Sequence, residues 1–321
     1  MSLVRAMAVL CLLVVLSVLV GCGSSNSTLV YQNISERASW SVDNFLAFTS
    51  IGGNGQRYIW RCNQYGGGQI LLTKTANDPT KLDEGGWHPA FNPAGNKVAF
   101  ASRRSGGSTS IYLMDAIDGD RVATARLTDS SVPGEDIQPS WKPDGTQIVF
   151  ASTKVIGGSG TGNLDIAVVN ADGTGRQYLI ATDELEQWPC FSPDGSRIAY
   201  QRGPSGGPTD ITLYTIAGGA SVNLTAPLRT GAGDMTRYEA PFWATVDGQE
   251  WIYFHSNRTG DFDLYRIKPD GTGLTQITND VRSDGYPVVS PSGKHVLFTR
   301  DRELWSCDPA GGNEKRLTRR Y

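Results

Sequence analysis

One pattern recurs along this chain and restricts what it can fold into. In "PSWKPDGTQIVFAS", from Pro139 to Ser152, an apolar run breaks at Pro-Asp-Gly and resumes as Ile-Val-Phe. Two short apolar runs joined by an Asp-Gly turn predict a β-hairpin. Related copies begin at Ala38, Pro89, Pro189, Pro241 and Pro287. A spacing of about 50 residues is typical of propellers and solenoids.

Each copy continues with two further predicted strands. The third strand is "RYIWRC", "SIYLMD", "DIAVVN", "ITLYTI", "DLYRIK" or "ELWSCD". The fourth ends in Leu-Thr or Ile-Thr at Thr73, Thr128, Thr225, Thr278 and Thr318, and more loosely in "QYLIATD" in the third copy. A superhelical solenoid would suit the period, but no segment after the N-terminus shows a helical 3.6-residue pattern. The repeats therefore predict an all-β fold, a six-bladed β-propeller of four-stranded antiparallel blades over residues 38–321.

The N-terminus has a different pattern. "MSLVRAMAVLCLLVVLSVLVGC" carries one basic residue and then a long apolar run, as secretory signals do. Leu19-Val20-Gly21-Cys22 resembles a bacterial lipobox, which predicts a signal peptide over 1–21, lipidation of Cys22 and a tether over 22–37. An uncleaved membrane anchor is the alternative. Ser27–Asn33 is expected to belong to the tether, although it would also suit an extra strand closing the ring.

These features predict an exported protein held to a membrane by its lipid. Gly23 stands where an Asp would favour retention in the inner membrane, so we expect the outer membrane, with the protein facing the periplasm. In a bacterium with a single membrane, the same anchor would hold it to the outer leaflet of the cell membrane. Two acyl chains give stable anchoring where one does not.

Charge and cysteine content restrict the function further. The chain has 29 basic and 32 acidic residues and no Lys/Arg stripe suited to phosphates, so no nucleic-acid partner is expected. Beyond Cys11 and Cys22, the chain contains Cys62, Cys190 and Cys307. Cys62 and Cys307 hold the same position in adjacent blades, but packed sheets lie too far apart for a disulfide. We expect three free, mostly buried thiols.

The repeats "SWKPDGTQIVFAS", "CFSPDGSRIAYQR" and "SNRTGDFDLYRIKPDGTGLTQIT" resemble the WD40-like repeats of TolB-type propellers, over about Ala38 to Thr318. Similar repeats occur in periplasmic Tol-system proteins, in the propeller half of dipeptidyl-peptidase-like enzymes and in some pectin-fragment lyases. The resemblance therefore implies the fold more than an activity. It also implies a channel mouth that accepts peptide segments.

Catalytic patterns are weak. His88 and His255 are expected on one face of the ring and His295 on the other, so a three-histidine metal site is not expected. Ser205 in "GPSGG" lacks the following helix of a nucleophile elbow. The Asp-Gly turns lack the ligand spacing of calcium loops. We therefore expect no catalytic residues, no metal and no cofactor.

The candidate ligand site is the face formed by the loops that precede the first strand and follow the second strand of each blade. Residues just before the first strand should surround the channel mouth: Glu84, Trp87, His88, Glu135, Asp136, Gln138, Glu186, Trp188, Tyr238, Glu239, Asp284 and Tyr286. Residues just after the second strand should form a basic collar: Arg103, Lys154, Arg202, Arg258 and Arg300. Salt bridges between blades are the structural alternative for these charges.

An acidic mouth with aromatic side chains suits an extended peptide or a protein loop. The sequence thus predicts a non-enzymatic binding or scaffolding module of the cell envelope, with an envelope protein or peptide segment docking at the mouth. A glycan-binding or lyase-like propeller is one alternative, because Trp87, Trp188 and Tyr286 would also stack on sugar rings. A structural subunit of an envelope complex is the other.

Overall fold

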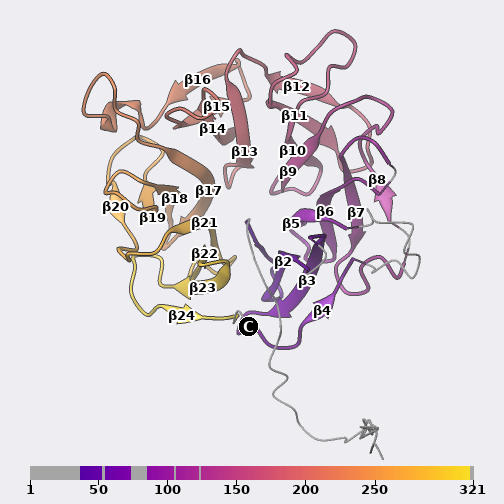
Figure 1. Cartoon of the computed structure of the whole chain (residues 1–321), viewed down its shortest axis with the longest axis horizontal. Helices are drawn as coiled ribbons and strands as arrows, with labels where there is room; N and C mark the ends of the chain where they lie inside the picture. The colour runs from indigo at the N-terminus through magenta and orange to yellow at the C-terminus, as the bar shows by residue number, and fades with distance from the viewer. Residues whose placement is uncertain (1–36, 53–54, 74–84, 105, 123, 319–321) are drawn as a thin grey trace, which may run out of the picture.

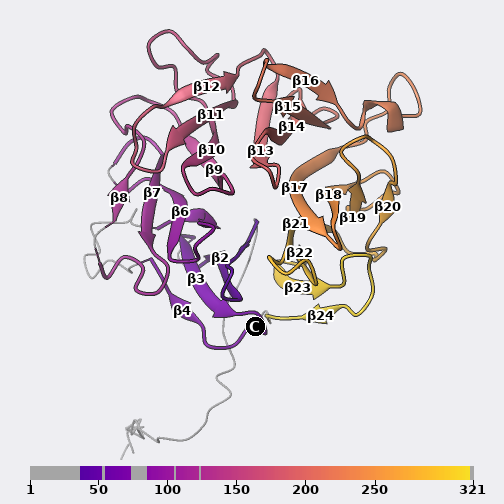
Figure 2. The same ribbon diagram turned by 180° about the vertical axis from the view of Figure 1, so that it is seen from behind.

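In this computed structural model, the predicted six-bladed β-propeller is confirmed. The structure describes residues 37–52, 55–73, 85–104, 106–122 and 124–318. They form six separate four-stranded antiparallel sheets, each built from four consecutive strands, and Figures 1 and 2 show the sheets arranged radially around a common centre. The described residues include no helix long and apolar enough to cross a membrane. The expected signal peptide, Cys22, the tether up to residue 36 and the segment Ser27–Asn33 lie outside the described residues.

The strands occupy equivalent places in every blade. The innermost strands are β1 (Ser39–Trp40), β5 (Trp87–Phe91), β9 (Asp136–Trp141), β13 (Leu185–Phe191), β17 (Tyr238–Val246) and β21 (Asp284–Val289). The second strands are β2 (Phe45–Ile51), β6 (Lys97–Ser102), β10 (Gln147–Ser152), β14 (Arg197–Gly203), β18 (Gln249–Ser256) and β22 (Val296–Arg300). The third strands are β3 (Arg57–Asn63), β7 (Ser110–Asp115), β11 (Asp165–Asn170), β15 (Asp210–Thr215), β19 (Asp263–Ile267) and β23 (Glu303–Cys307).

The outermost strands are shorter. They are β4 (Ile70–Leu71), β8 (Ala125–Arg126), β12 (Gln177–Ile180), β16 (Ala220–Asn223), β20 (Thr275–Gln276) and β24 (Lys315–Arg316). One short 3-10 helix, η1 (Ala226–Leu228), follows β16.

The second strands supply the core of the ring. Their sequences are apolar on both faces because neighbouring blades cover both sides of each sheet. One aromatic side chain in each blade occupies the same place and is at most 1% exposed: Phe48, Phe100, Phe150, Tyr200, Phe254 and Phe298. Every hydrophobic cluster joins two neighbouring blades, so no blade has a complete core of its own.

The repeated threonine at the end of each unit has a structural reason. The Thr73 hydroxyl oxygen accepts a hydrogen bond from the backbone N–H of Ile59 in β3 at 3.0 Å, where the adjacent strand has ended. The same bond, at 2.8–3.0 Å, is made by Thr128, Thr225, Thr278 and Thr318. In the third blade, where the motif is looser, the Thr182 hydroxyl instead donates to the carboxylate of Glu186.

The ring closes between the last blade and the first by packing. Trp40, Leu46 and Phe48 share one buried cluster with Val288, Leu297 and Leu304 of the last blade. The loop after β3 also approaches the end of β24 closely, since a Cβ on Gly66 would lie 2.0 Å from the carbonyl oxygen of Leu317. Gly66 has a φ of 83°, so this position requires glycine for both conformation and space.

The three described cysteines, Cys62, Cys190 and Cys307, are free and buried, as predicted. Burial raises the pKa of Cys62 and Cys307 to about 12 and that of Cys190 to about 11. The thiols therefore stay protonated at neutral pH and act as small apolar side chains.

Candidate functional site

A repeated backbone irregularity creates the inner wall of the channel. In β5, the pair His88-Pro89 opposes Phe100 alone, because the register shifts between Trp87 and Ala90. This β-bulge recurs in the innermost strand of the next four blades. Proline fits there because a bulged residue needs no N–H for the ladder. The residue before each proline has a positive φ of 49–59°: His88, Gln138, Trp188, Ala240 and Tyr286.

These bulged residues also connect neighbouring blades. The backbone N–H of His88 donates to the Thr49 hydroxyl at 3.2 Å, and that of Gln138 donates to Nδ1 of His88 at 3.3 Å. In the same way, the backbone N–H of Trp188 donates to Oε1 of Gln138 at 2.8 Å, and that of Ala240 donates to Oε1 of Gln201 at 3.3 Å. The backbone N–H of Tyr286 donates to Nδ1 of His255 at 3.2 Å. Five consecutive blade junctions are thus linked around the channel, which fixes the direction of each bulged side chain.

Arg37 occupies the corresponding place in the first blade. Its side chain extends across the channel, where Nη2 donates to the carbonyl oxygen of Pro241 at 2.7 Å. Its guanidinium lies 5.1 Å from the centre of the Trp188 ring, a cation–π distance. Ala240 is the one small residue among the bulged positions, and it precedes the carbonyl that Arg37 reaches.

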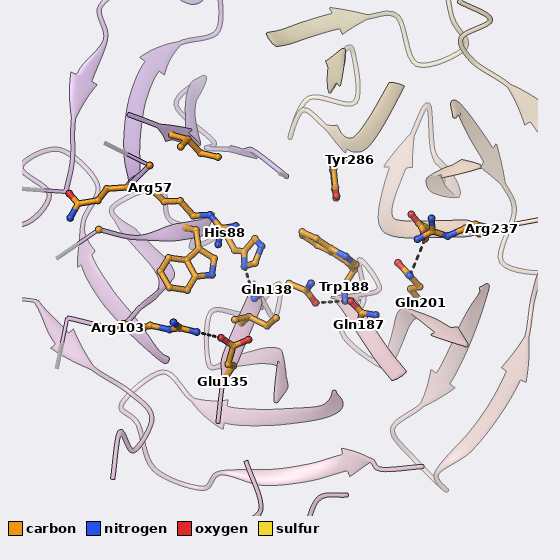
Figure 3. Close-up of a pocket in the computed structure, with 17 residues that line it drawn as sticks. Arg57, His88, Arg103, Glu135, Gln138, Gln187, Trp188, Gln201, Arg237 and Tyr286 are labelled. Atoms are coloured by element: carbon orange, nitrogen blue, oxygen red, sulfur yellow. Dashed lines mark hydrogen bonds and ion pairs between the residues drawn. The ribbon is translucent and has the colours of Figure 1, made fainter. Parts of the chain in front are cut away.

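Aromatic rings fill the centre of the channel. Trp188 lies 5.0 Å from the His88 ring and 5.0 Å from the Tyr286 ring, and Tyr286 lies 5.0 Å from His255. Figure 3 shows Trp188 in the middle of the channel, between His88 and Tyr286. With Arg37, these residues connect blades that are far apart in the sequence.

A cavity of about 860 Å³ lies at the mouth above these rings. It is lined by Ile51, Gly55, Gln56, Arg57, Gly85, Trp87, His88, Arg103, Glu135, Ile137, Gln138, Gln187, Trp188, Gln201, Arg237, Glu239 and Tyr286. The lining combines large aromatic rings with amide and charged groups, a combination that binds ligands by stacking and by hydrogen bonds.

The structure brings together seven of the predicted mouth residues in this lining: Trp87, His88, Glu135, Gln138, Trp188, Glu239 and Tyr286. Asp136, Glu186, Tyr238 and Asp284 are at most 1% exposed and lie outside it. Glu84 lies outside the described residues. The reason is strand alternation: each of these four buried residues stands two positions before a bulged residue, and its side chain points to the face opposite that of the residue that follows it.

The basic collar is distributed in the same way. Arg103 lines the cavity, whereas Lys154 and Arg300 are at most 1% exposed. Arg202 lies 2.6 Å from Glu184 and 3.8 Å from Glu186, and Arg258 lies 5.8 Å from the centre of the Tyr265 ring.

The expected acidic mouth is corrected by these positions. Glu186 stands directly opposite Arg202, and Asp284 directly opposite Arg300, in the pairing of first and second strands. Arg300 Nε lies 2.5 Å from Asp284, and Lys154 Nζ lies 2.8 Å from Asp136. The buried acids and cations of this prediction are therefore partners within one blade, whereas the exposed pair of Glu135 and Arg103 joins two neighbouring blades at the mouth.

The remaining cavity acids are paired with arginines. Glu135 forms an ion pair with Arg103, and Glu239 with Arg237 at 2.5 Å. Nε2 of His255 lies 3.3 Å from Glu239. Although burial acts in the opposite direction, His255 and Arg237 hold the pKa of the Glu239 carboxyl below its usual range.

Sequence analysis missed Arg37 beneath Trp188, and among the lining residues it missed Gln56, Arg57 and Gln201. Arg37 stands in the position of "RASW" that His88 holds in "HPAF", so aligning the copies one residue earlier would have found it. Gln201 follows the buried aromatic residue of its second strand, as Thr49 and His255 do in theirs. Gln56 and Arg57 open a third strand and carry no such signal.

No group of three metal-binding side chains is found within the described ranges. His88 and His255 lie at the channel, while the His295 ring lies 6.2 Å from the Trp40 ring and parallel to it. Ser205 lies in the loop between β14 and β15 and is exposed.

His88 should make stability depend on pH. Burial, with the nearby charges of Arg57 and Arg37, holds the pKa of His88 well below its ordinary value of 6.5. As pH falls through about 6.5, His88 therefore binds a proton in the unfolded chain but not in the folded chain. The free energy of unfolding falls as pH falls below that value. We expect His88→Gln to remove about 2 kcal/mol of the loss between about pH 7 and pH 5. Urea unfolding of both proteins at the two pH values measures this.

Glutamine is the matched replacement, since Gln138 accepts the same inter-blade hydrogen bond in the next blade. An equal loss of stability in wild type and His88→Gln would show that His88 is not the titrating group.

No family model matches the chain. An uncharacterized protein of Agrobacterium fabrum is 34% identical over 124 residues, 39% of this chain and 39% of that protein. A TolB homologue of Chlorobium luteolum is 26% identical over 233 residues, 71% of this chain and 48% of that protein. The chain thus spans less than half the length of these curated relatives.

Solved structures share the fold. TolB from Acinetobacter baumannii superimposes with a TM-score of 0.53 at 20% identity, over 74% of this chain and 52% of that one. An oligogalacturonate lyase in complex with manganese gives a TM-score of 0.59 at 12% identity, over 90% of this chain and 78% of that one. The class is therefore the six-bladed propeller of four-stranded blades, which occurs both in TolB and in an enzyme. Together with the TolB relatives, the repeats identify this chain as a TolB-like β-propeller.

Proposed function

We propose that this protein is a non-enzymatic binding module of the bacterial cell envelope, and that its channel mouth receives an extended segment of a partner protein. The observation that carries the proposal is the cavity itself. Its volume of about 860 Å³ lies within the usual range of ligand sites. Trp87, Trp188 and Tyr286 offer apolar faces, and the half-buried Gln56 and Gln187 offer amide groups to a peptide backbone.

The fixed geometry of the site supports binding without prior rearrangement. The bulged residues that carry the rings are held by hydrogen bonds from blade to blade, so little side-chain entropy is lost when a segment enters. The TolB relatives include proteins named for the Tol-Pal system, which is consistent with a protein partner in the envelope.

The N-terminal sequence supports export, with Cys22 as the lipidated residue that holds the propeller to a membrane. In this proposal the protein faces the periplasm from the outer membrane, or stands outside the cell membrane of a bacterium with a single membrane. The lipid restricts the search for a partner to one surface and raises the effective concentration there.

Site-specific photocrosslinking in intact cells tests the proposal. A photoreactive residue at Gln187, which lines the cavity, should give crosslinks to one protein partner. The matched control is Gln249, an exposed glutamine at the start of β18, between the first and second strands and thus on the opposite face.

Crosslinks from Gln187 alone would support the mouth as the binding site. Equal crosslinks from Gln249 would favour a structural subunit that associates through other surfaces. No protein crosslink, with saccharide purifying with the chain, would favour the glycan-binding alternative, which the stacking faces of Trp87 and Trp188 also suit.

A further inference from the structure

One buried carboxylate of the fourth blade stands apart from the arginine opposite it. In the last blade, Asp284 of the first strand pairs with Arg300 of the second strand, and Arg300 Nε lies 2.5 Å from the carboxylate. Glu186 stands opposite Arg202 in the same way, but Arg202 Nε lies 3.8 Å from Glu186 Oε1. The same Nε lies 2.6 Å from Glu184. Arg202 thus pairs with the half-exposed acid rather than with the buried one.

The environment of Glu186 disfavours a charge on its carboxyl. The residue is 0% exposed, Thr182 donates a hydrogen bond to Oε1, and within the described part of the chain Oε2 is buried without a hydrogen-bond partner. Such burial costs an ionised oxygen far more than a neutral one. Burial and the nearby Asp165 raise the pKa of the Glu186 carboxyl, although Thr182 and Arg202 act in the opposite direction.

The groups that face Glu186 come from two blades. Asp165, also 0% exposed, begins β11 of the third blade, Tyr200 and Arg202 belong to β14, and Glu184 directly precedes β13. Burial raises the pKa of Tyr200, so its hydroxyl stays protonated at neutral pH. Arg202 is the cation of this group and lies between two carboxylates. Among the described residues its Nε makes no hydrogen bond of good geometry, so the contact with Glu184 does not fix its position.

We propose that Glu186 is a proton-controlled switch that moves Arg202 between two carboxylates. With Glu186 protonated, Arg202 pairs with Glu184 at the surface, as in this structure. When Glu186 ionises, Arg202 turns inward and pairs with it, as Arg300 pairs with Asp284 in the last blade. The guanidinium already lies within 4 Å of both carboxylates, so rotation of its side chain is sufficient. The switch does not depend on the binding proposed at the channel mouth.

The switch acts on the surface beside the mouth. Glu184 and Arg202 line a second cavity of about 310 Å³, formed by the loops that follow β14 and precede β17. Both loops lie on the mouth face. When Arg202 turns inward, the Glu184 side chain, which is 43% exposed, loses this cation. A rise in pH therefore makes this cavity more negative.

Carbon-13 NMR of the full chain in detergent micelles, with labelled glutamate and arginine, tests the switch. The Glu186 carboxyl should titrate above its ordinary value of 4.5, and the guanidinium signal of Arg202 should change with the same midpoint. Glu186→Gln is a neutral replacement of nearly the same shape, and it should abolish the change at Arg202 with that midpoint.

Glu184→Gln tests the second position of Arg202. Without its surface partner Arg202 should pair with Glu186 more readily, so Glu186 should titrate at a lower pH than in the wild type. Glu250→Gln is the matched control, because Glu250 is a half-buried acid that pairs with Arg197 at 3.1 Å, near the turn between β17 and β18 on the opposite face. It should leave the Glu186 midpoint unchanged.

Urea unfolding supplies a second measurement. A carboxyl whose pKa is higher in the folded chain than in the unfolded chain contributes stability that is lost as pH rises. The wild type and Glu186→Gln should therefore be similarly stable near pH 4, and the wild type should become the less stable protein by about pH 8. His88 is present in both proteins, so its titration cancels in the comparison.

Three results would overturn the proposal: a Glu186 midpoint at or below 4.5, an Arg202 signal that does not follow that midpoint, or the same midpoint in the wild type and Glu184→Gln. An equal effect of Glu250→Gln would also overturn it. If Glu186→Gln failed to fold, the half-exposed Glu184→Gln would still decide, because its effect on the Glu186 midpoint is measured with Glu186 in place.

Discussion

Replacing Asp136 with Ala should lower the free energy of unfolding by about 3 to 5 kcal/mol. The Asp136 carboxylate is fully buried and accepts from two cations, Lys154 Nζ at 2.8 Å and Arg176 Nη1 at 3.1 Å. Lys154 is also fully buried. Removing the carboxylate leaves both positive charges inside the blade without their counterion, which costs far more than the contact itself. Urea denaturation monitored by circular dichroism measures the change.

Glu135 provides the matched control, because it directly precedes Asp136 at the start of β9. It also forms an ion pair with an arginine, but the side chains of Arg103 and Glu135 are 49% and 40% exposed. Because water screens that pair, Glu135→Ala should cost less than about 1 kcal/mol. A loss for Asp136→Ala no larger than the loss for Glu135→Ala would show that the buried pair is not a stabilising unit.

The sequence predicts the fold almost completely because each blade repeats the same physical solution. The recurring Phe or Tyr of the second strand, the Asp-Gly turns and the final Thr each perform one local task. Phe150 fills the interface between blades, Asp144 accepts from the Thr146 N–H at 2.9 Å in the turn, and Thr128 accepts from Ile111. Such local signals survive in a single sequence.

The site is less predictable because it depends on the direction of individual side chains. Glu135 and Asp136 are adjacent acids in the same motif, yet one lines the cavity and the other is buried with Lys154. Strand alternation turns adjacent side chains to opposite faces, and the pairing of Asp136 with Ser152 shows which of the two enters the blade. Arg37 was missed for a related reason, since its target, the carbonyl of Pro241, lies 204 residues away.

Trp188→Ala should be the most damaging change at the channel, with a loss of about 3 to 5 kcal/mol in the free energy of unfolding. The ring is 9% exposed and contacts His88, Tyr286 and Arg37, which come from three other blades. Its removal opens a cavity and takes away the aromatic face against which a buried guanidinium rests. Thermal and urea unfolding measure the loss.

Two other variants separate the possible causes. Trp188→Phe keeps an aromatic face above Arg37 and should recover most of the stability, because the cation–π contact needs a ring more than an indole N–H. Trp87→Ala removes a half-buried tryptophan of the same cavity that makes a cation–π contact with Arg57, and it should cost less than Trp188→Ala. A loss at Trp188 no larger than at Trp87 would mean that the central ring does not hold the blades together. A larger loss at Trp188 would show that the side chains at the floor of the cavity also hold the first, second, fourth and last blades together. A segment bound against Trp188 would then stabilise the folded ring.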